Sequence, residues 1–358
     1  MVNVAFYSHT IDFAGTWRSH ERIAEILQHD PRFNVSVMYS PAVEHNRLQE
    51  SKKILEKCNF VQFERSLQKT GAGDGWRPLS SNIESIVKDN NIHIFHFARS
   101  GYYEWPFTSR IAPVHIETNI FGYDDASPYL DGSIFIGKCL GISESSRSIL
   151  LPNPIPPPSK DYEDLQSLRQ ELGISKDAIV FGRVGRPANF TPISLLAYEA
   201  FKRNYAGNSK YLIMGGCEDT KRCVDQLGLK DDVIFVDCTN DDEYIEKFHK
   251  TIDVFAHYRS DGEICSTALA QAMMCGIPVI THVAGRNGQI EWLGDGGFYA
   301  RDPSDYFKAM MVMSDENHRL DIAKKAKKFA ASNFDQKTIV NKVIEFYLNI
   351  ARSKNCEF

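Results

Sequence analysis

The feature that most constrains the fold is a regular alternation of short apolar strands with amphipathic helices. Segments rich in β-branched and aromatic residues, each the length of one strand, occur at 2–8, 33–39, 92–97, 113–119 and 132–137. A helical spacing of apolar residues appears between them, first at 18–28. This alternation predicts α/β architecture, in which a parallel sheet is covered by helices on both faces.

A proline-rich connector divides the pattern into two halves. The stretch "LPNPIPPPSKDYEDL" has five prolines between 152 and 158, and proline excludes both helix and central strand. The alternation then restarts, with strands expected at 178–185, 210–216, 232–237, 253–258 and 278–281 and helices at 193–204, 242–249, 265–275 and 303–314. We therefore expect two doubly wound, Rossmann-like domains, 1–152 and 153–335, facing a cleft. Ligands should bind at the carboxyl ends of their strands.

Composition narrows the class of protein and of partner. The 358 residues are 43% hydrophobic and 24% charged with a net charge of −5, so a nucleic-acid partner is not expected. Without a signal peptide or an apolar run near the ~18 residues of a membrane helix, the expected location is cytoplasmic. The eight cysteines form no C-x-x-C pair and should be reduced. The basic run "KKAKKF" (324–329) reads as a solvated helix face, so membrane contact should be peripheral at most.

The stretch "GEICSTALAQAMMCGIPVIT" (262–281) combines a buried helix and strand with two polar groups. Glu263 precedes the expected helix, and Gln271 lies eight residues later, roughly 12 Å along it. Free N–H groups at a helix start favour an anion, and Gly262 lets the chain approach that anion closely. Alternatively, Glu263 caps the helix and Gln271 is bonded to the backbone.

This stretch resembles the E-x7-E signature of retaining GT-B glycosyltransferases of family 4, with Gln271 in the place of the second Glu. The resemblance implies that Glu263 contacts the donor sugar and that Gln271 binds the ribose. It also implies that the helix start holds the diphosphate, through Gly262, Cys265, Ser266 and Thr267.

The segment "FGRVGRPANFTPISLLAYEAF" (181–201) resembles the strand, loop and helix that carry an Arg and a Lys in that family. Arg186 fits the Arg position, where a guanidinium would neutralise charge on the departing diphosphate. Asn189 stands at the Lys position, and Arg183 is a second candidate for that cation. A loop salt bridge is the alternative role of Arg186.

The first 120 residues resemble the family more weakly. "YSHTIDFAGTWRSHERIAEIL" (7–27) is similar to its first loop, where Gly15 would lie near the donor, and "IHIFHFARSGYYEWP" (92–106) is similar to its H-x-H strand, with Ala98 at the second His. The resemblance implies a catalytic role for His96 and an acceptor-side position for Arg18, His20 and Arg99. The segment 336–358 would be a helix that crosses back to the N-terminal domain.

The resemblance implies a metal-independent transfer, with retained configuration, from a nucleotide-diphosphate sugar to a glycan, lipid-linked or other acceptor. No cofactor is expected, and the chain has no D-x-D triplet for a metal. Two other classes stay open: an inactive homologue serving as a binding or scaffold subunit, suggested by Ala98, Asn189 and Gln271, and a nucleotide-sugar epimerase or hydrolase.

Overall fold

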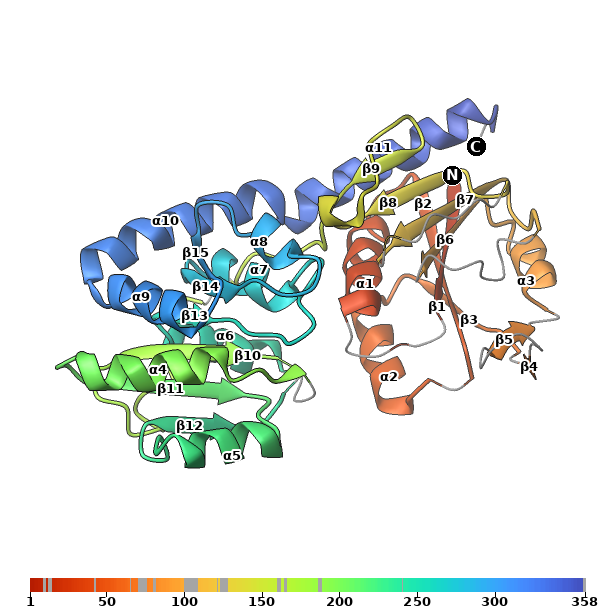
Figure 1. Cartoon of the computed structure of the whole chain (residues 1–358). Helices are drawn as coiled ribbons and strands as arrows, with labels where there is room; N and C mark the ends of the chain where they lie inside the picture. Colours follow the sequence, from red (N-terminus) through yellow and green to blue (C-terminus); the bar gives the residue numbers. More distant parts are fainter. Residues whose placement is uncertain are drawn as a thin grey trace. The chain divides into compact units, whose positions relative to one another are not determined.

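The computed structural model forms two compact units, and each is described by itself (Figure 1). Unit 1 comprises Met1–Pro156 and Gln336–Phe358, and unit 2 comprises Pro157–Asp335. The structure describes the chain except at 9–10, 12–14, 42, 65, 70–75, 80–81, 100–108, 121, 123–127, 160–161, 164–165, 186–188, 240 and 357–358, and it describes only the backbone at 15, 66–69, 76–79 and 99.

Unit 1 is built on a seven-stranded parallel sheet in the order β3-β2-β1-β6-β7-β8-β9. Its strands are β1 (Val2–Ser8), β2 (Phe33–Tyr39), β3 (Asn59–Gln62), β6 (Ile94–Arg99), β7 (Val114–Asn119), β8 (Gly132–Phe135) and β9 (Ser148–Leu150). A separate antiparallel pair consists of β4 (Ser66–Lys69) and β5 (Trp76–Leu79). The strand order reverses between β1 and β6, which is the point where parallel α/β sheets bind ligands.

Helices cover this sheet because their apolar faces complete its core. They are α1 (Gly15–Leu27), α2 (His45–Ile54), α3 (Ile83–Asp89) and the short 3₁₀ helix η1 (Lys138–Leu140). Within α1, Trp17, Ile23, Ala24 and Leu27 are buried at helical spacing. A buried ion pair joins α1 to α2, with the Arg47 Nη2 atom 2.6 Å from the Glu21 Oε2 atom.

Helix α11 (Gln336–Ser353) belongs to unit 1 although unit 2 separates it from the rest of that unit in sequence. Its buried residues, among them Ile339, Val343, Phe346, Tyr347 and Ile350, join the same core cluster as β1 and β2. Polar contacts hold both ends: Gln336 donates to the Arg22 carbonyl (2.8 Å), and the Lys354 ammonium lies 2.7 Å from Asp131.

Unit 2 repeats the architecture with a six-stranded parallel sheet in the order β12-β11-β10-β13-β14-β15. Its strands are β10 (Ile179–Val184), β11 (Ser209–Met214), β12 (Val233–Val236), β13 (Val254–Ala256), β14 (Val279–His282) and β15 (Gly297–Ala300). The strand order reverses between β10 and β13. This second switch point locates the loops that follow β10 and β13 at the ligand-binding edge.

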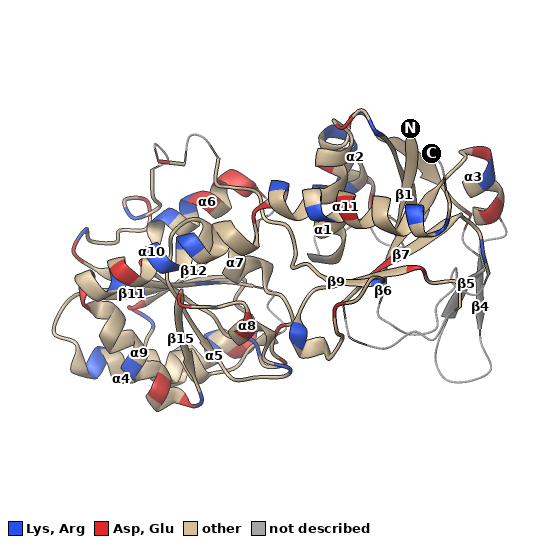
Figure 2. Ribbon diagram, turned by 90° about the horizontal axis from the view of Figure 1, so that it is seen from above, with Lys and Arg blue, Asp and Glu red and all other residues tan. Residues whose placement is uncertain are grey.

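The helices of unit 2 are α4 (Ile193–Asn204), α5 (Glu218–Gln226), α6 (Asp242–Thr251), α7 (Thr267–Met274), α8 (Gly288–Glu291), α9 (Pro303–Ser314) and α10 (Glu316–Asn333). Lys, Arg, Asp and Glu are distributed over the helices of both units (Figure 2). Helix α7 begins two residues later than predicted, because the Ser266 side chain caps it by accepting from the Leu269 N–H group. The predicted fold class, two doubly wound parallel sheets, is confirmed.

Candidate functional site

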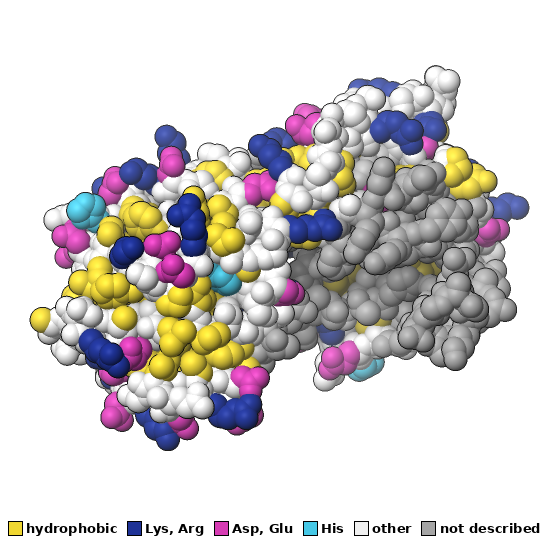
Figure 3. All heavy atoms as spheres, in the orientation of Figure 1, with side chains coloured by type: hydrophobic (Ala, Val, Ile, Leu, Met, Phe, Trp, Pro, Cys, Tyr) yellow, Lys and Arg dark blue, Asp and Glu magenta, His cyan; other side chains and the backbone are white. Residues whose placement is uncertain are grey.

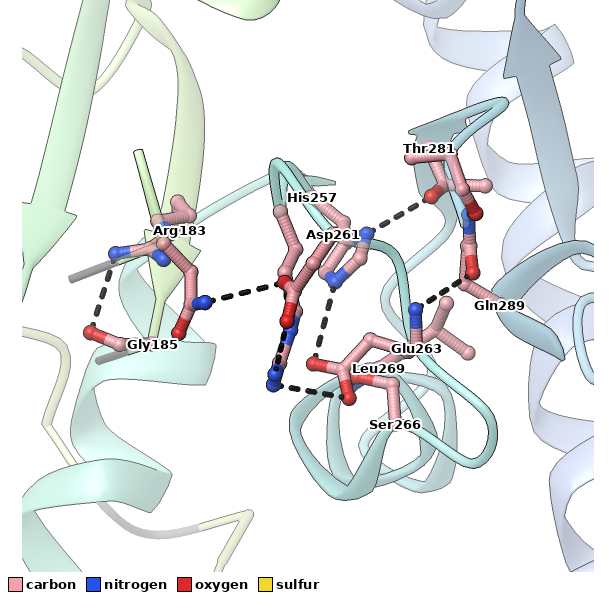
Figure 4. A network of polar contacts seen from close by, with 12 residues as sticks. Arg183, Gly185, His257, Asp261, Glu263, Ser266, Leu269, Thr281 and Gln289 are labelled. Carbon is pink, nitrogen blue, oxygen red and sulfur yellow. Dashed lines mark hydrogen bonds and ion pairs between the residues drawn. The ribbon is translucent and has the colours of Figure 1, made fainter. Parts of the chain in front are cut away.

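The candidate site lies where two loops leave the unit 2 sheet at its switch point. Strand β10 continues through Gly185 toward Asn189, and β13 continues into residues 257–266, which lead directly into α7. These loops touch, because Ser260 N donates to the Asn189 carbonyl at 3.2 Å. The residues around Glu263 form one polar network at this edge (Figure 4).

Glu263 is a half-buried carboxylate held by two neighbours. Its Oε2 atom is 3.4 Å from Arg259 Nη1, and its Oε1 atom is 3.8 Å from His257 Nε2. Burial by itself raises the pKa of Glu263, but hydrogen bonding and charge from His257, followed by the charge of Arg259, bring the pKa below its usual value. The group is therefore an anion at neutral pH, partly open to solvent.

Arg259 links Glu263 to the loop that follows β10. Its guanidinium grips Asp261, with Nε 2.6 Å from Oδ1 and Nη2 3.0 Å from Oδ2. Asn189, which stands at the family's Lys position, donates to the same Asp261 Oδ1 atom at 3.1 Å. The Asn189 amide is thus tied to a carboxylate of the neighbouring loop.

The backbone around Glu263 is fixed by close packing of two loops. Gly262 has φ +69°, and a Cβ added there would lie 2.1 Å from the Ala284 carbonyl oxygen. Only glycine fits this conformation and this contact. The fully buried Gln289 accepts from the Glu263 N–H group (2.9 Å) and donates to the carbonyls of His282 and Ala284. The required glycine and the buried amide therefore set the position of Glu263.

The start of α7, four residues after Glu263, presents open hydrogen-bond donors. Ser266 is buried and accepts from Leu269 N at 3.4 Å. The N–H groups of Thr267 and Ala268 have no intrahelical partner and make no hydrogen bond to other described residues. Cys265 is buried and Thr267 is half-buried. Because a helix start carries partial positive charge, these donors suit an anionic group.

Gln271 lies on α7 among buried neighbours but is itself only half-buried. Within the described part of the chain its side chain makes no hydrogen bond, so its amide is available to water or to a ligand. A backbone-bonded core amide, the alternative reading of the sequence, is not what the described residues display. Ribose binding by Gln271 stays a prediction.

The cations predicted to meet the diphosphate lie in different surroundings. Arg186 falls outside the described residues. Arg183 is only 3% exposed, and its Nη1 atom donates to the carbonyls of Gly185 (3.1 Å) and Gly215 (3.2 Å). Its guanidinium also stacks on the Tyr258 ring, 4.2 Å from the centroid. Arg183 therefore braces the carboxyl ends of β10 and β11 from inside.

In unit 1, His96 and His20 belong to one buried polar cluster. His96 Nε2 is 2.8 Å from Thr118 Oγ1, and His96 Nδ1 is 2.5 Å from the Tyr347 hydroxyl on α11. His20 Nε2 lies 3.4 Å from the same Thr118 oxygen. Burial lowers the pKa of His20 to about 3, and burial together with the nearby His20 ring lowers that of His96 well below 6.5. Both rings are neutral at physiological pH.

The other unit 1 candidates lie near the switch point of their own sheet. Gly15 is the first residue of α1, and Arg18, one turn on, is 3.5 Å from Glu21. Arg99 ends β6, and its side chain lies outside the described atoms. Acceptor-side roles for Arg18, His20 and Arg99, and a donor-side role for Gly15, stay predictions.

The members of the unit 2 network that were not predicted from the sequence include His257, Arg259, Thr281 and Gln289. The signal that could have identified three of them is their position. His257 and Arg259 directly follow the buried strand β13, and Thr281 lies near the end of β14, so all three occupy the ligand-binding edge. Gln289 gave no such signal, because its role depends on a contact with residue 263 across the fold.

Metal binding would need a cluster of ligating side chains, and membrane spanning would need a long apolar helix. Among the described residues, no group of three or more His, Cys, Asp or Glu side chains is placed to hold a metal ion, and no helix is both long and apolar enough to cross a membrane. In the basic run of α10, Lys325 pairs with Asp321 at 2.7 Å. On the face drawn in Figure 3, unit 2 mixes both charge signs with apolar side chains.

Comparison with known proteins agrees with this architecture. Residues 164–329 match the family model described as glycosyl transferases group 1. Among curated proteins no match is found. The fold is similar to a glycosyltransferase from Rickettsia africae ESF-5 (TM-score 0.76, 12% identity, 98% of each chain covered). It is also similar to sucrose-phosphate synthase from Thermosynechococcus elongatus (0.71, 15%, 99% of this chain and 100% of that one).

A third similar structure is Anabaena HepE in complex with UDP and glucose (TM-score 0.69, 14% identity, 96% of this chain and 99% of that one). At these identities the structural likeness establishes the GT-B fold. Together with the group 1 family match over most of unit 2, it supports a glycosyltransferase enzyme.

Proposed function

We propose that this GT-B glycosyltransferase is a retaining enzyme of the family 4 type, which transfers a sugar from a nucleotide-diphosphate donor to a glycan, lipid-linked or other acceptor. One observation carries the proposal: a fixed, ionised carboxylate, Glu263, lies in the loop that leads into the open N–H groups of α7 at the switch point of the unit 2 sheet. An anion site beside a hydroxyl-binding carboxylate is the combination that a sugar diphosphate needs.

In this proposal the diphosphate binds the start of α7. The N–H groups of Thr267 and Ala268 and the helix dipole would stabilise the negative charge that grows on the leaving group. Arg186 would add a guanidinium from the loop after β10. Glu263 would orient the donor sugar by accepting hydrogen bonds from its hydroxyls, and Gln271 would bind the ribose. Displacement at the anomeric carbon would then proceed with retained configuration.

The donor class has support from a similar protein. Anabaena HepE, which shares the fold, is described in complex with UDP and glucose. A nucleoside diphosphate and a sugar are thus accommodated by a structure of this kind. The eight free cysteines support a cytoplasmic location, since unpaired thiols are usual there.

The proposal includes binding that does not require a divalent metal. Calorimetry with UDP and with GDP, each with and without EDTA, tests this step. Affinity unchanged by EDTA is the expected result, and affinity lost on chelation would contradict it. Turnover of a nucleotide-sugar panel, followed by NMR of the anomeric proton of the product, tests the transfer and its stereochemistry. A product of inverted configuration would reject the retaining mechanism.

A binding or scaffold subunit is the second candidate. It is favoured by Asn189, whose uncharged amide stands at the family's Lys position and is engaged by Asp261. The same nucleotide-sugar panel separates the two functions, since the scaffold would bind donors without transfer or hydrolysis.

A further inference from the structure

We infer that His257 is a positioning residue for Glu263 and that the hydroxyl of Thr281 holds the His257 ring in one tautomer. The inference rests on the sugar-orienting role proposed above for Glu263. It assigns a function to His257 and Thr281, two residues of the unit 2 network that have no role in the reaction proposed above.

Three elements bring the residues together. His257 follows β13 directly and is 3% exposed, Thr281 lies on β14 and is fully buried, and Glu263 precedes α7. The His257 Nδ1 atom is 2.8 Å from Thr281 Oγ1, while its Nε2 atom faces Glu263 Oε1 at 3.8 Å. Figure 4 shows the ring between the threonine and the carboxylate.

The buried hydroxyl of Thr281 determines the tautomer. Within the described part of the chain, the only hydrogen-bond partner of this hydroxyl is His257 Nδ1. A buried hydroxyl hydrogen without an acceptor is costly, so Thr281 donates and Nδ1 accepts. A neutral ring that accepts at Nδ1 carries its proton on Nε2. That proton points at Glu263.

The other described charged groups around Glu263 do not contact the carboxylate oxygen that His257 faces. Arg259 faces the other carboxylate oxygen, Oε2, at 3.4 Å and also binds Asp261. His282 on β14 does not compete, because its Nε2 atom accepts from Arg259 N (3.1 Å) and its Nδ1 atom faces the Val283 carbonyl (3.1 Å). Each carboxylate oxygen of Glu263 therefore has its own partner: Arg259 for Oε2 and His257 for Oε1.

Two separate contacts restrain rotation of the carboxylate and favour its ionised form. At 3.8 Å the His257 contact is electrostatic in the free protein, and such contacts commonly shorten when substrate binds. Without the Nε2 proton, Oε1 would lose its partner while Arg259 still held Oε2. We therefore expect Glu263 to bind a proton more readily and to orient the sugar less well.

Matched variants separate positioning from packing. His257→Phe keeps the ring volume but removes the donor, whereas His257→Gln places an amide N–H near the Nε2 position. Thr281→Val removes the hydroxyl that fixes the tautomer, and Thr281→Ser keeps it. If His257→Phe does not fold, the Thr281 pair still tests the inference.

The first readout is the acid limb of the pH profile of kcat/KM. His257→Phe should move it to higher pH by roughly half a unit or more, since Glu263 loses a partner of its charged form. Thr281→Val should move it less, and His257→Gln and Thr281→Ser should keep it near the wild-type position. A purely structural role would lower the rate and the Tm without moving this limb, and that result would overturn the inference.

The second readout needs no turnover. In the full chain labelled with ¹⁵N-histidine, the His257 signals, assigned by their loss in His257→Phe, should show that the neutral form of the ring carries its proton on Nε2. Thr281→Val should alter this tautomer balance, and Thr281→Ser should retain it. A wild-type ring protonated at Nδ1 would overturn the inference even in an active enzyme. Absent turnover with every donor, beside the expected tautomer, would instead count against the proposed function alone.

Discussion

Each unit contains a histidine–threonine contact between neighbouring strands near the switch point of its sheet. In unit 1, His96 on β6 lies 2.8 Å from Thr118 on β7, and in unit 2, His257 after β13 lies 2.8 Å from Thr281 on β14. In each sheet the His lies on or just after the strand that follows the reversal of strand order, β6 or β13. The Thr lies on the neighbouring strand, β7 or β14. The threonine contacts Nε2 of His96 but Nδ1 of His257, and the pairs also differ in the partner of the other ring nitrogen.

The chemical character of that second partner distinguishes the two histidines, while the catalytic role of His96 stays a prediction. His96 turns its Nδ1 atom to the Tyr347 hydroxyl, inside the core that α11 completes. His257 turns its Nε2 atom to Glu263, which is half-buried and charged. A histidine near the switch point can therefore contact a packed helix, as His96 does, or face a carboxylate, as His257 does. The difference predicts that changes in the unit 1 pair alter stability, whereas changes around the unit 2 pair alter activity.

The largest expected effect is on activity at Glu263. Replacing Glu263 by Gln removes the charge but keeps the shape, and loss of such a transition-state contact typically costs ~2–4 kcal/mol. We expect kcat/KM to fall by about two orders of magnitude in steady-state assays, with little change in Tm. The exposed Glu316→Gln variant is the control. Wild-type activity in Glu263→Gln would remove Glu263 from the mechanism.

The next effect is on stability below neutral pH and arises from His20. Its pKa is about 3 in the folded unit against 6.5 in the unfolded chain, so between these values only the unfolded chain binds the proton. Stability should therefore decrease as pH falls from 6.5 toward 3, by at most about 1.4 kcal/mol per pH unit from this group. His20→Gln should flatten the dependence of the unfolding free energy on pH, measured by urea titration. An unchanged slope would contradict burial of a neutral His20.

A smaller loss of stability is expected at Tyr347. Tyr347→Phe leaves His96 Nδ1 without its partner in the core, which should cost about 1–2 kcal/mol of unfolding free energy. Tyr39→Phe is a control in the same unit, because the Tyr39 hydroxyl makes no hydrogen bond to the described residues although the side chain is mostly buried. Denaturation of both variants measures the difference. A loss of activity in Tyr347→Phe with unchanged stability would contradict the prediction that changes in the unit 1 pair alter stability.

The smallest effect concerns Gln271. Gln271→Leu should keep the fold and weaken nucleotide binding by about tenfold, since one hydrogen bond of this kind contributes roughly 0.5–1.5 kcal/mol. Gln271→Glu should be tolerated, because a half-buried carboxylate can meet ribose hydroxyls and water. Thermal melts and calorimetry with UDP measure both. A Glu variant that unfolds, beside a Leu variant that binds normally, would make Gln271 a core residue.

The sequence predicts the sheets well because strand and helix signals are local. The predicted helices 193–204 and 303–314 coincide with α4 and α9, and the predicted strand 33–39 coincides with β2. The start of α7 was missed by two residues, since capping by Ser266 depends on side-chain geometry that periodicity does not register.

The polar networks are harder to predict because their members are distant in sequence. Tyr347 bonds His96 across 251 positions, and Gln289 holds the Glu263 backbone across 26. The identity of Glu263 and Gln271 as candidates came from one contiguous stretch. The partners of Glu263 lie outside that stretch: His257 and Arg259 follow β13, and Gln289 lies on α8.

The return of α11 to unit 1 has a consequence for biosynthesis. Unit 2 is a continuous segment, 157–335, so all of its residues are translated before α11. Unit 1 cannot complete its core until residues 336–353 have been translated. Until then the apolar surface that packs against Phe346 and Ile350 is exposed, and His96 lacks the Tyr347 hydroxyl as a partner. Because nascent domains generally fold as they emerge, the first unit to be translated is the last to be finished. A message truncated before codon 336 would yield a complete second unit joined to an unfinished, aggregation-prone first one.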